Sequence, residues 1–204
     1  MSHAQRASEH EKYLRVRRFA RHVHRGETRG SGKPYMSHPL DVLKVFKKFY
    51  TYDGREVGWK QAAVVIAHDT IEHGGSLLEL RKIAGSKVAR HIEALSYDPK
   101  IDRSTRQGRN EALADTVRRI KAEPKWVHLV KLCDAYCNAK PSEMKPTWNF
   151  ADCARFESEK RYLLDELGGP WPRMAEVLEG RLFTFRATYH KKFNVVDAQL
   201  GVCV

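Results

Sequence analysis

The chain has 204 residues, of which 42% are hydrophobic and 30% are charged, and its formal net charge is +12 at pH 7. These proportions are typical of a single globular domain with a proper core. No apolar run reaches the roughly 18 residues that a membrane-spanning helix needs, and the charged N-terminus does not resemble a signal peptide. The sequence therefore predicts a cytoplasmic protein that has no membrane partner.

The excess of positive charge favours an anionic partner, which is either a phosphorylated small molecule or a nucleic acid. The basic residues are scattered along the chain, and neither an aromatic RNA-binding motif nor zinc-finger spacing is present. A phosphorylated nucleotide is therefore the preferred partner and a nucleic acid the less favoured one. No pattern indicates an oligomeric state.

Helical patterns dominate the first part of the chain. Apolar spacing predicts a helix over 4–25, which Gly26 ends. Pro39 suits the first position of a second helix, which would put His38 at the N-cap. The alanine-rich stretch 59–73 is bounded by glycines, and its length favours a buried helix over a short strand.

The remainder of the chain continues in the same way. Ser76 is a plausible cap for two short helices that Gly85 separates, and the tail from Asn194 is expected to be a short strand or an irregular segment. The fold class that follows is all-α. Four more helices are predicted over residues 108–122, 125–140, 152–167 and 172–190.

A His-Asp pair follows the most apolar part of the third predicted helix, in "VVIAHDTIEHGG". Adjacent side chains on a helix are about 100° apart, so His68 and Asp69 can both reach one metal ion from the end of that helix. Glu72 would share the face of His68 and could contact a water molecule beside the ion. An unpaired Asp here would cost several kcal/mol, which favours a cation as its partner.

Two other residues can complete such a site. Asp134 lies within the apolar helix "HLVKLCDAYCNAK", where it is either a metal ligand or half of a buried salt bridge to Lys or Arg. His38 begins its own helix after a glycine-containing turn. Two His and two Asp make a mixed nitrogen and oxygen donor set that suits Mn²⁺, Fe²⁺ or Zn²⁺ and leaves positions open for water and substrate oxygens.

Three stretches together resemble a known family. "GSGKPYMSHPLDV", "AHDTIEH" and "LVKLCDAYCNAK", in this order and spacing, are similar to the hydrolase domain of the RelA/SpoT superfamily, and more narrowly to the small alarmone hydrolases of the metazoan SpoT-homologue type. The resemblance covers about residues 10–140. It implies an all-helical HD-domain bundle that binds one Mn²⁺ and removes the 3′-pyrophosphate of (p)ppGpp, the nucleotide of the stringent response.

The resemblance also implies roles for particular residues. Glu72 would orient or deprotonate the attacking water, and Arg29 and Asn138 would contact the nucleotide. We further predict a phosphohydrolase domain over 1–165, with 166–204 as a helical extension packed on the same domain. The residues that match the family's metal ligands are His38, His68, Asp69 and Asp134.

The chain departs from the family pattern at three positions: His73 stands where the family has an acid, Ala135 follows the Asp in place of Arg or Lys, and Gly30 replaces a basic residue. His73 is either a catalytic group beside the water or only the solvent-facing end of its helix. The departures leave two alternatives open: an HD-type phosphatase or phosphodiesterase for another nucleotide such as NADPH, or a nucleotide-binding module without catalysis.

Overall fold

The structure is a computed structural model that describes residues 3–195. The prediction for the tail from Asn194 therefore lies outside this range for all residues after Val195. In the described part the chain forms α-helices and one short 3₁₀ turn, with no strand beyond an isolated bridge between Thr28 and Pro34, so the all-α prediction is confirmed. No helix of this part is long and apolar enough to cross a membrane. The elements are α1 (His3–Val23), α2 (Ser37–Tyr52), α3 (Trp59–Ile66), α4 (Leu77–Ala84), α5 (Ser86–Leu95), α6 (Arg106–Lys121), α7 (Lys125–Asn138), η1 (Pro141–Glu143), α8 (Phe150–Leu167) and α9 (Pro172–Lys192).

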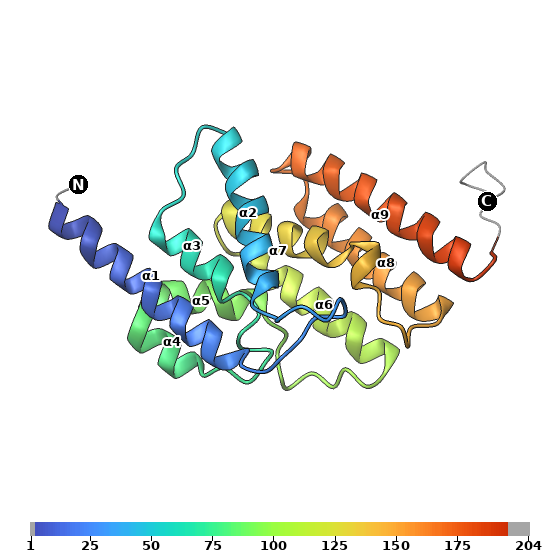
Figure 1. Ribbon diagram of the computed structural model, residues 1–204, viewed down its shortest axis with the longest axis horizontal. Helices are drawn as coiled ribbons and strands as arrows, with labels where there is room; N and C mark the ends of the chain where they lie inside the picture. Colours follow the sequence, from blue (N-terminus) through green and yellow to red (C-terminus); the bar gives the residue numbers. More distant parts are fainter. Residues whose placement is uncertain (1–2, 196–204) are drawn as a thin grey trace.

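Helix α7 lies at the centre of the bundle (Figure 1). Every side chain from Val127 to Ala135 is buried, as expected for a helix that is apolar on nearly all sides. Helices α2, α8 and α9 pack directly on it. Any polar side chain on α7 must therefore find its partners inside the protein.

Two groups of helices flank this centre (Figure 1). Helix α1 packs on α3 and α4 at one side, and α8 and α9 lie side by side at the other. Trp171, Leu178 and Leu182 from the α8–α9 connection and α9 belong to the same main hydrophobic core as α2 and α7. The C-terminal helix thus packs on the body of the bundle. The predicted domain boundary at residue 165 would fall inside α8, and this boundary stays a prediction.

The predicted helix over 59–73 is wrong in its extent, because α3 ends at Ile66 and hydrogen-bonded turns follow to Gly74. The imidazole Nδ1 of His68 lies 2.8 Å from the Val65 carbonyl oxygen. A continued helix would use that oxygen for the N–H of Asp69, so the side chain competes with the next helical bond. As a result His68 and Glu72 do not share the face of one helix.

The structure confirms the predictions for Ser76 and Gly85 and corrects the one for His38. The Ser76 side chain caps α4 by accepting the N–H of Glu79, and Gly85 separates α4 from α5 with a φ of 85°. The N-cap prediction for His38 is wrong by two positions, because α2 begins at Ser37 and His38 is its second residue. The helix extends upstream because Ser37 N–H already donates to the Pro34 carbonyl at 3.0 Å.

Glu157 joins α8 to α9 through a buried carboxylate. Its Oε1 accepts hydrogen bonds from Arg161 at 2.6 Å and from Arg186 at 2.9 Å, and its Oε2 accepts the Tyr189 hydroxyl at 2.8 Å. Burial by itself would raise the pKa of Glu157, but the hydrogen bonds from Arg186, Tyr189 and Arg161 outweigh it and lower that pKa below its usual 4.5.

We expect Glu157→Gln to lower the free energy of unfolding at pH 7 by roughly 1–3 kcal/mol, because hydrogen bonds to a charged group are lost. A carboxyl group with a lowered pKa stabilises the fold above its unfolded pKa and loses that contribution as the pH falls through its folded pKa. Urea unfolding at several pH values should therefore show parent and variant converging below about pH 4.5. Glu179→Gln, on the exposed side of α9, is the control. A pH-independent difference would contradict the ionic role of Glu157.

Candidate metal centre

His38 points from the first turn of α2 toward α7. Its Nε2 lies 3.1 Å from Oδ1 of Asp134, and its side chain is buried. The turn before the helix sets this orientation, since the His38 N–H donates to the Tyr35 carbonyl at 2.8 Å. The turn before α2 and the first turn of α2 thus place the His38 imidazole at the centre of the bundle.

His68 and Asp69 come from the turns after α3. The Nδ1–H of His68 donates to the Val65 carbonyl, which directs Nε2 into the site. That Nε2 lies 3.4 Å from Oδ1 of Asp134 and 3.8 Å from Oδ2 of Asp69. The end of α3 therefore places an imidazole and a carboxylate at the same point.

Asp134 receives partners on both of its oxygens. The amide of Asn138, one turn later on α7, donates to Oδ1 at 2.6 Å. On the other oxygen, Nζ of the buried Lys131 lies 3.4 Å from Oδ2 and also donates to the Leu95 carbonyl. Asp134 forms the buried salt bridge to a lysine that the sequence allows. It also lies beside His38 and His68, and its role as a metal ligand stays a prediction.

The donor set can hold a divalent metal ion. Ligand atoms of His38, His68 and Asp69 all lie within 4.8 Å of one another, and all three residues are buried. Two atoms facing the gap, Nε2 of His68 and Oδ2 of Asp69, are buried without a hydrogen-bond partner. A buried nitrogen and a buried carboxylate oxygen without a hydrogen bond are costly, and a cation between them would offset that cost. With Asp134 beside them, the set has two nitrogen and two oxygen donors.

The pKa shifts of His68 and Asp134 also favour a cation in the cluster. Burial opposes a charge on His68, but the carboxylates of Asp69 and Asp134 outweigh it and raise the pKa of His68 to about 9. Burial likewise opposes ionisation of Asp134, yet Lys131, His38 and His68 hold its pKa well below the usual range. The protein thus concentrates negative charge where a proton on His68, or a metal ion in its place, must balance it.

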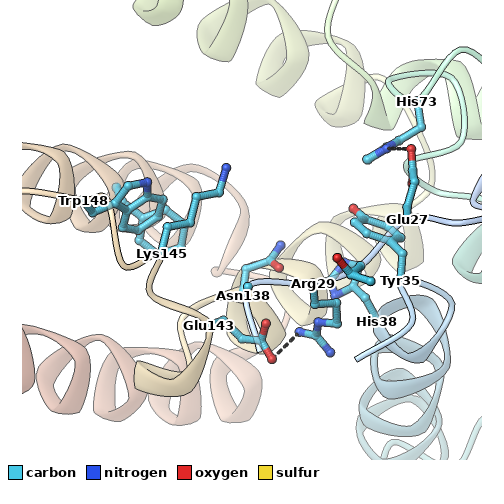
Figure 2. Close-up of a pocket in the computed structure, with 12 residues that line it drawn as sticks. Glu27, Arg29, Tyr35, His38, His73, Asn138, Glu143, Lys145 and Trp148 are labelled. Carbon is cyan, nitrogen blue, oxygen red and sulfur yellow. Dashed lines mark hydrogen bonds and ion pairs between the residues drawn. The ribbon is translucent and has the colours of Figure 1, made fainter. Parts of the chain in front are cut away.

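A cleft of about 560 Å³ adjoins this cluster at His38, which is one of its lining residues (Figure 2). His38 and Tyr35 lie on the side next to the buried acids, and Lys145 and Trp148 lie across the opening. The remaining lining residues are Glu27, Thr28, Arg29, Gly30, His73, Asn138, Glu143 and Phe156.

Both residues predicted to contact a nucleotide line this cleft. Asn138 lies beside the cluster, with its amide on Asp134. Arg29 is buried between two acids: its guanidinium lies 3.2 Å from Asp41 and 3.2 Å from Glu143. Figure 2 shows the pair with Glu143. The two carboxylates fix the position of Arg29 and balance much of its charge.

The two residues predicted to act on water point in different directions. Glu72 is exposed, and its Oε1 accepts the Tyr97 N–H at 3.2 Å. His73 lines the cleft, and its Nδ1 lies 3.0 Å from Oε1 of Glu27 (Figure 2). Contact with Glu27 rules out a His73 directed only at solvent.

Sequence reasoning missed three residues of the site. His24 is buried and contacts Asp69, and the ring of Tyr35 stacks on His24 at 4.5 Å. His24 carries no pattern of its own in the sequence, whereas Tyr35 lies within the quoted stretch "GSGKPYMSHPLDV" and could have been found there. Lys131 could have been found, because it precedes Asp134 by three residues on an apolar helix and so shares its face.

A family model described as an HD domain matches residues 17–155. This range covers more than half of the 204 residues and all of the residues in the buried cluster. The chain belongs to the HD domain family.

Curated relatives of this HD domain carry names from alarmone metabolism. A guanosine-3′,5′-bis(diphosphate) 3′-pyrophosphohydrolase of Vibrio cholerae is 32% identical over 125 residues, which are 59% of this chain and 16% of that protein. A GTP pyrophosphokinase of Myxococcus xanthus is 30% identical over 128 residues, 60% of this chain and 16% of that protein. The HD domain thus spans a small part of these relatives.

A solved structure is similar to this chain over a longer range than the sequence relatives are. A metazoan orthologue of SpoT, described as hydrolysing ppGpp and acting in starvation responses, matches with a TM-score of 0.71 at 16% identity, over 87% of this chain and 96% of that one. At this identity the match supports the fold, namely an all-α HD bundle. Together with the named relatives, it confirms the RelA/SpoT resemblance that the three motifs indicate.

We expect His68→Ala and Asp69→Ala to lose the bound divalent ion, because each removes a buried ligand atom that no other group replaces. Elemental analysis of metal-reconstituted protein measures this directly. The control is His128→Gln, which alters a buried histidine of α7 outside the cluster. Full metal content in both alanine variants, with circular dichroism showing intact helices, would rule out the site.

Proposed function

We propose that this HD domain is a metal-dependent hydrolase that removes the 3′-pyrophosphate of (p)ppGpp. The observation that carries the proposal is the buried cluster of two imidazoles and two carboxylates at the inner side of the cleft. The pyrophosphohydrolase named among the relatives supports the choice of substrate. A cytoplasmic location and a part in the stringent response are predictions that accompany this function.

Mn²⁺ is the ion that we propose, with Fe²⁺ and Zn²⁺ as substitutes, because all three accept mixed imidazole and carboxylate donors. When bound, such an ion supplies a positive charge that polarises a phosphoryl oxygen and makes a nearby water molecule more acidic. The residues that would hold it are His38, His68, Asp69 and Asp134. His38 also lines the cleft, so the centre is accessible to a substrate.

The chain's own side chains would do the remaining work. Glu72 would turn from the Tyr97 amide, position the attacking water and accept its proton. Arg29 and Asn138 would hold the nucleotide at the inner wall, and exposed Lys145 would meet its phosphates from across the cleft (Figure 2). Donors fixed in advance stabilise the charge that develops on the phosphate during hydrolysis.

One departure from the family pattern keeps a different nucleotide, such as NADPH, as the alternative substrate of the same chemistry. A Cβ atom at Gly30 would lie 3.1 Å from the backbone oxygen of Glu143, so this position has little room for a side chain. The basic residue that the family carries here cannot be accommodated without moving η1. Phosphate recognition at this wall must then come from other residues, and binding without hydrolysis is the remaining alternative.

A screen of phosphorylated nucleotides with Mn²⁺-reconstituted protein tests the proposal. We expect pyrophosphate to be released from ppGpp and pppGpp. Release of inorganic phosphate from NADPH, with no reaction of ppGpp, would replace the proposed substrate but keep the hydrolase. Tight binding of a nucleotide without any product, at full metal content, would establish a binding module.

Glu72→Gln should retain the metal and lower kcat by roughly a hundredfold, because it removes a proton acceptor but no ligand. Glu79→Gln, at an exposed position of α4, serves as the control and should keep full turnover. Steady-state kinetics and elemental analysis on the same preparations separate the two effects. Normal turnover of Glu72→Gln would assign the water to another group.

A further inference from the structure

A second group of metal-binding side chains lies beside the first. His24 follows α1, Glu27 lies in the next turn, and His73 follows the His-Asp pair. Nδ1 of His24 is 2.8 Å from Oε2 of Glu27, and Nδ1 of His73 is 3.0 Å from Oε1 of the same carboxylate. The three ligand atoms all lie within 4.8 Å of one another.

The buried His24 is oriented as a metal ligand would be. Its Nε2 lies 3.2 Å from Oδ1 of Asp69, so a proton on Nε2 leaves the lone pair of Nδ1 facing Glu27. The Tyr35 ring stacks on His24 at 4.5 Å between centroids and lies 4.6 Å from His73. Packing and a carboxylate contact thus hold the imidazole in one orientation.

The site also has an open side. The side chains of Glu27 and His73 are 35% and 28% exposed, and both line the cleft. An ion could therefore enter from solvent and keep a coordination position for water or for a ligand oxygen. Two imidazole nitrogens and one carboxylate oxygen form a common donor set for Zn²⁺ sites of this open kind.

We propose that His24, Glu27 and His73 form a second divalent-cation site, of the zinc-binding class, on the wall of the cleft. The site shares no ligand with the first one. Asp69 contacts both, because its Oδ1 faces His24 while its Oδ2 faces His68. A cation held here adds positive charge where an anionic ligand would enter the cleft.

The competing explanation is that Glu27 only pairs with protonated histidines. Burial opposes a charge on His24, but its hydrogen bonds to Asp69 and Glu27 outweigh that and raise its pKa. Both explanations account for the short contacts of Glu27. They differ in whether the apo protein binds a stoichiometric ion at these residues, and metal content measures this without any assay of activity.

The experiment titrates Zn²⁺ into chelator-treated protein and measures bound metal after gel filtration. The double variant His38→Ala/His68→Ala removes the first site and isolates the second. We expect two ions per chain in the parent and one in this background. Adding Glu27→Gln or His73→Asn to the background should weaken Zn²⁺ binding at least about tenfold, since even residues that only support metal ligands have effects of that size.

His22→Asn in the same background is the control, because His22 is an exposed histidine near the end of α1 and lies outside the cluster. If the background variant loses its helical circular dichroism, the measurement moves to the parent, where Glu27→Gln alone should reduce two bound ions to one. The proposal is overturned if the folded background binds no Zn²⁺. It is equally overturned if neither Glu27→Gln nor His73→Asn weakens the binding.

Discussion

Asp134 carries a negative charge into a helix that is buried on all sides, and the arrangement of the centre follows from the need to balance that charge. A buried carboxylate without partners costs several kcal/mol. Lys131 supplies a cation from the same helix, and His38 and His68 arrive from two other elements. The helices that bring these side chains also bury apolar residues in the main core. Apolar packing and charge balance thus select the same placement of α2 and α3 against α7.

Because α3 ends at Ile66, the residues that follow it point to several different partners. Within six residues the chain directs His68 and Asp69 inward, Glu72 to the Tyr97 amide and His73 to Glu27. A continuous helix would have repeated the same direction every fourth residue. Because turns replace the helix, neighbouring residues reach separate partners, and one short segment contributes to both clusters and to the cleft.

The wall opposite the cluster comes from a later part of the chain. η1 approaches the Gly30 backbone closely, and Glu143 there holds Arg29. Lys145, Trp148 and Phe156 follow on the same wall. The match to the HD family ends at residue 155, so the residues of this wall lie at the C-terminal end of the matched range. The α7–α8 connection meets the turn before α2 at this wall, and the packing of α8 on α9 supports that connection.

The sequence by itself determined the helical fold class, most helix boundaries and the residues that could bind metal. Helical periodicity, Ser76 as a cap and Gly85 as a break are local properties, and local hydrogen bonds and backbone preferences decide them. His68, Asp69 and Asp134 were identifiable because polar groups beside or within apolar runs need a partner, and His38 because it begins a helix after a glycine-containing turn. The end of α3 at Ile66 follows a local hydrogen bond from His68 to the Val65 carbonyl, which the apolar pattern does not reveal. The tertiary structure alone decided that Glu27 meets His73 as well as His24, and that Arg29 lies between Asp41 and Glu143. These features depend on contacts between residues up to 114 positions apart, such as Arg29 with Glu143, and no short-range pattern encodes such contacts.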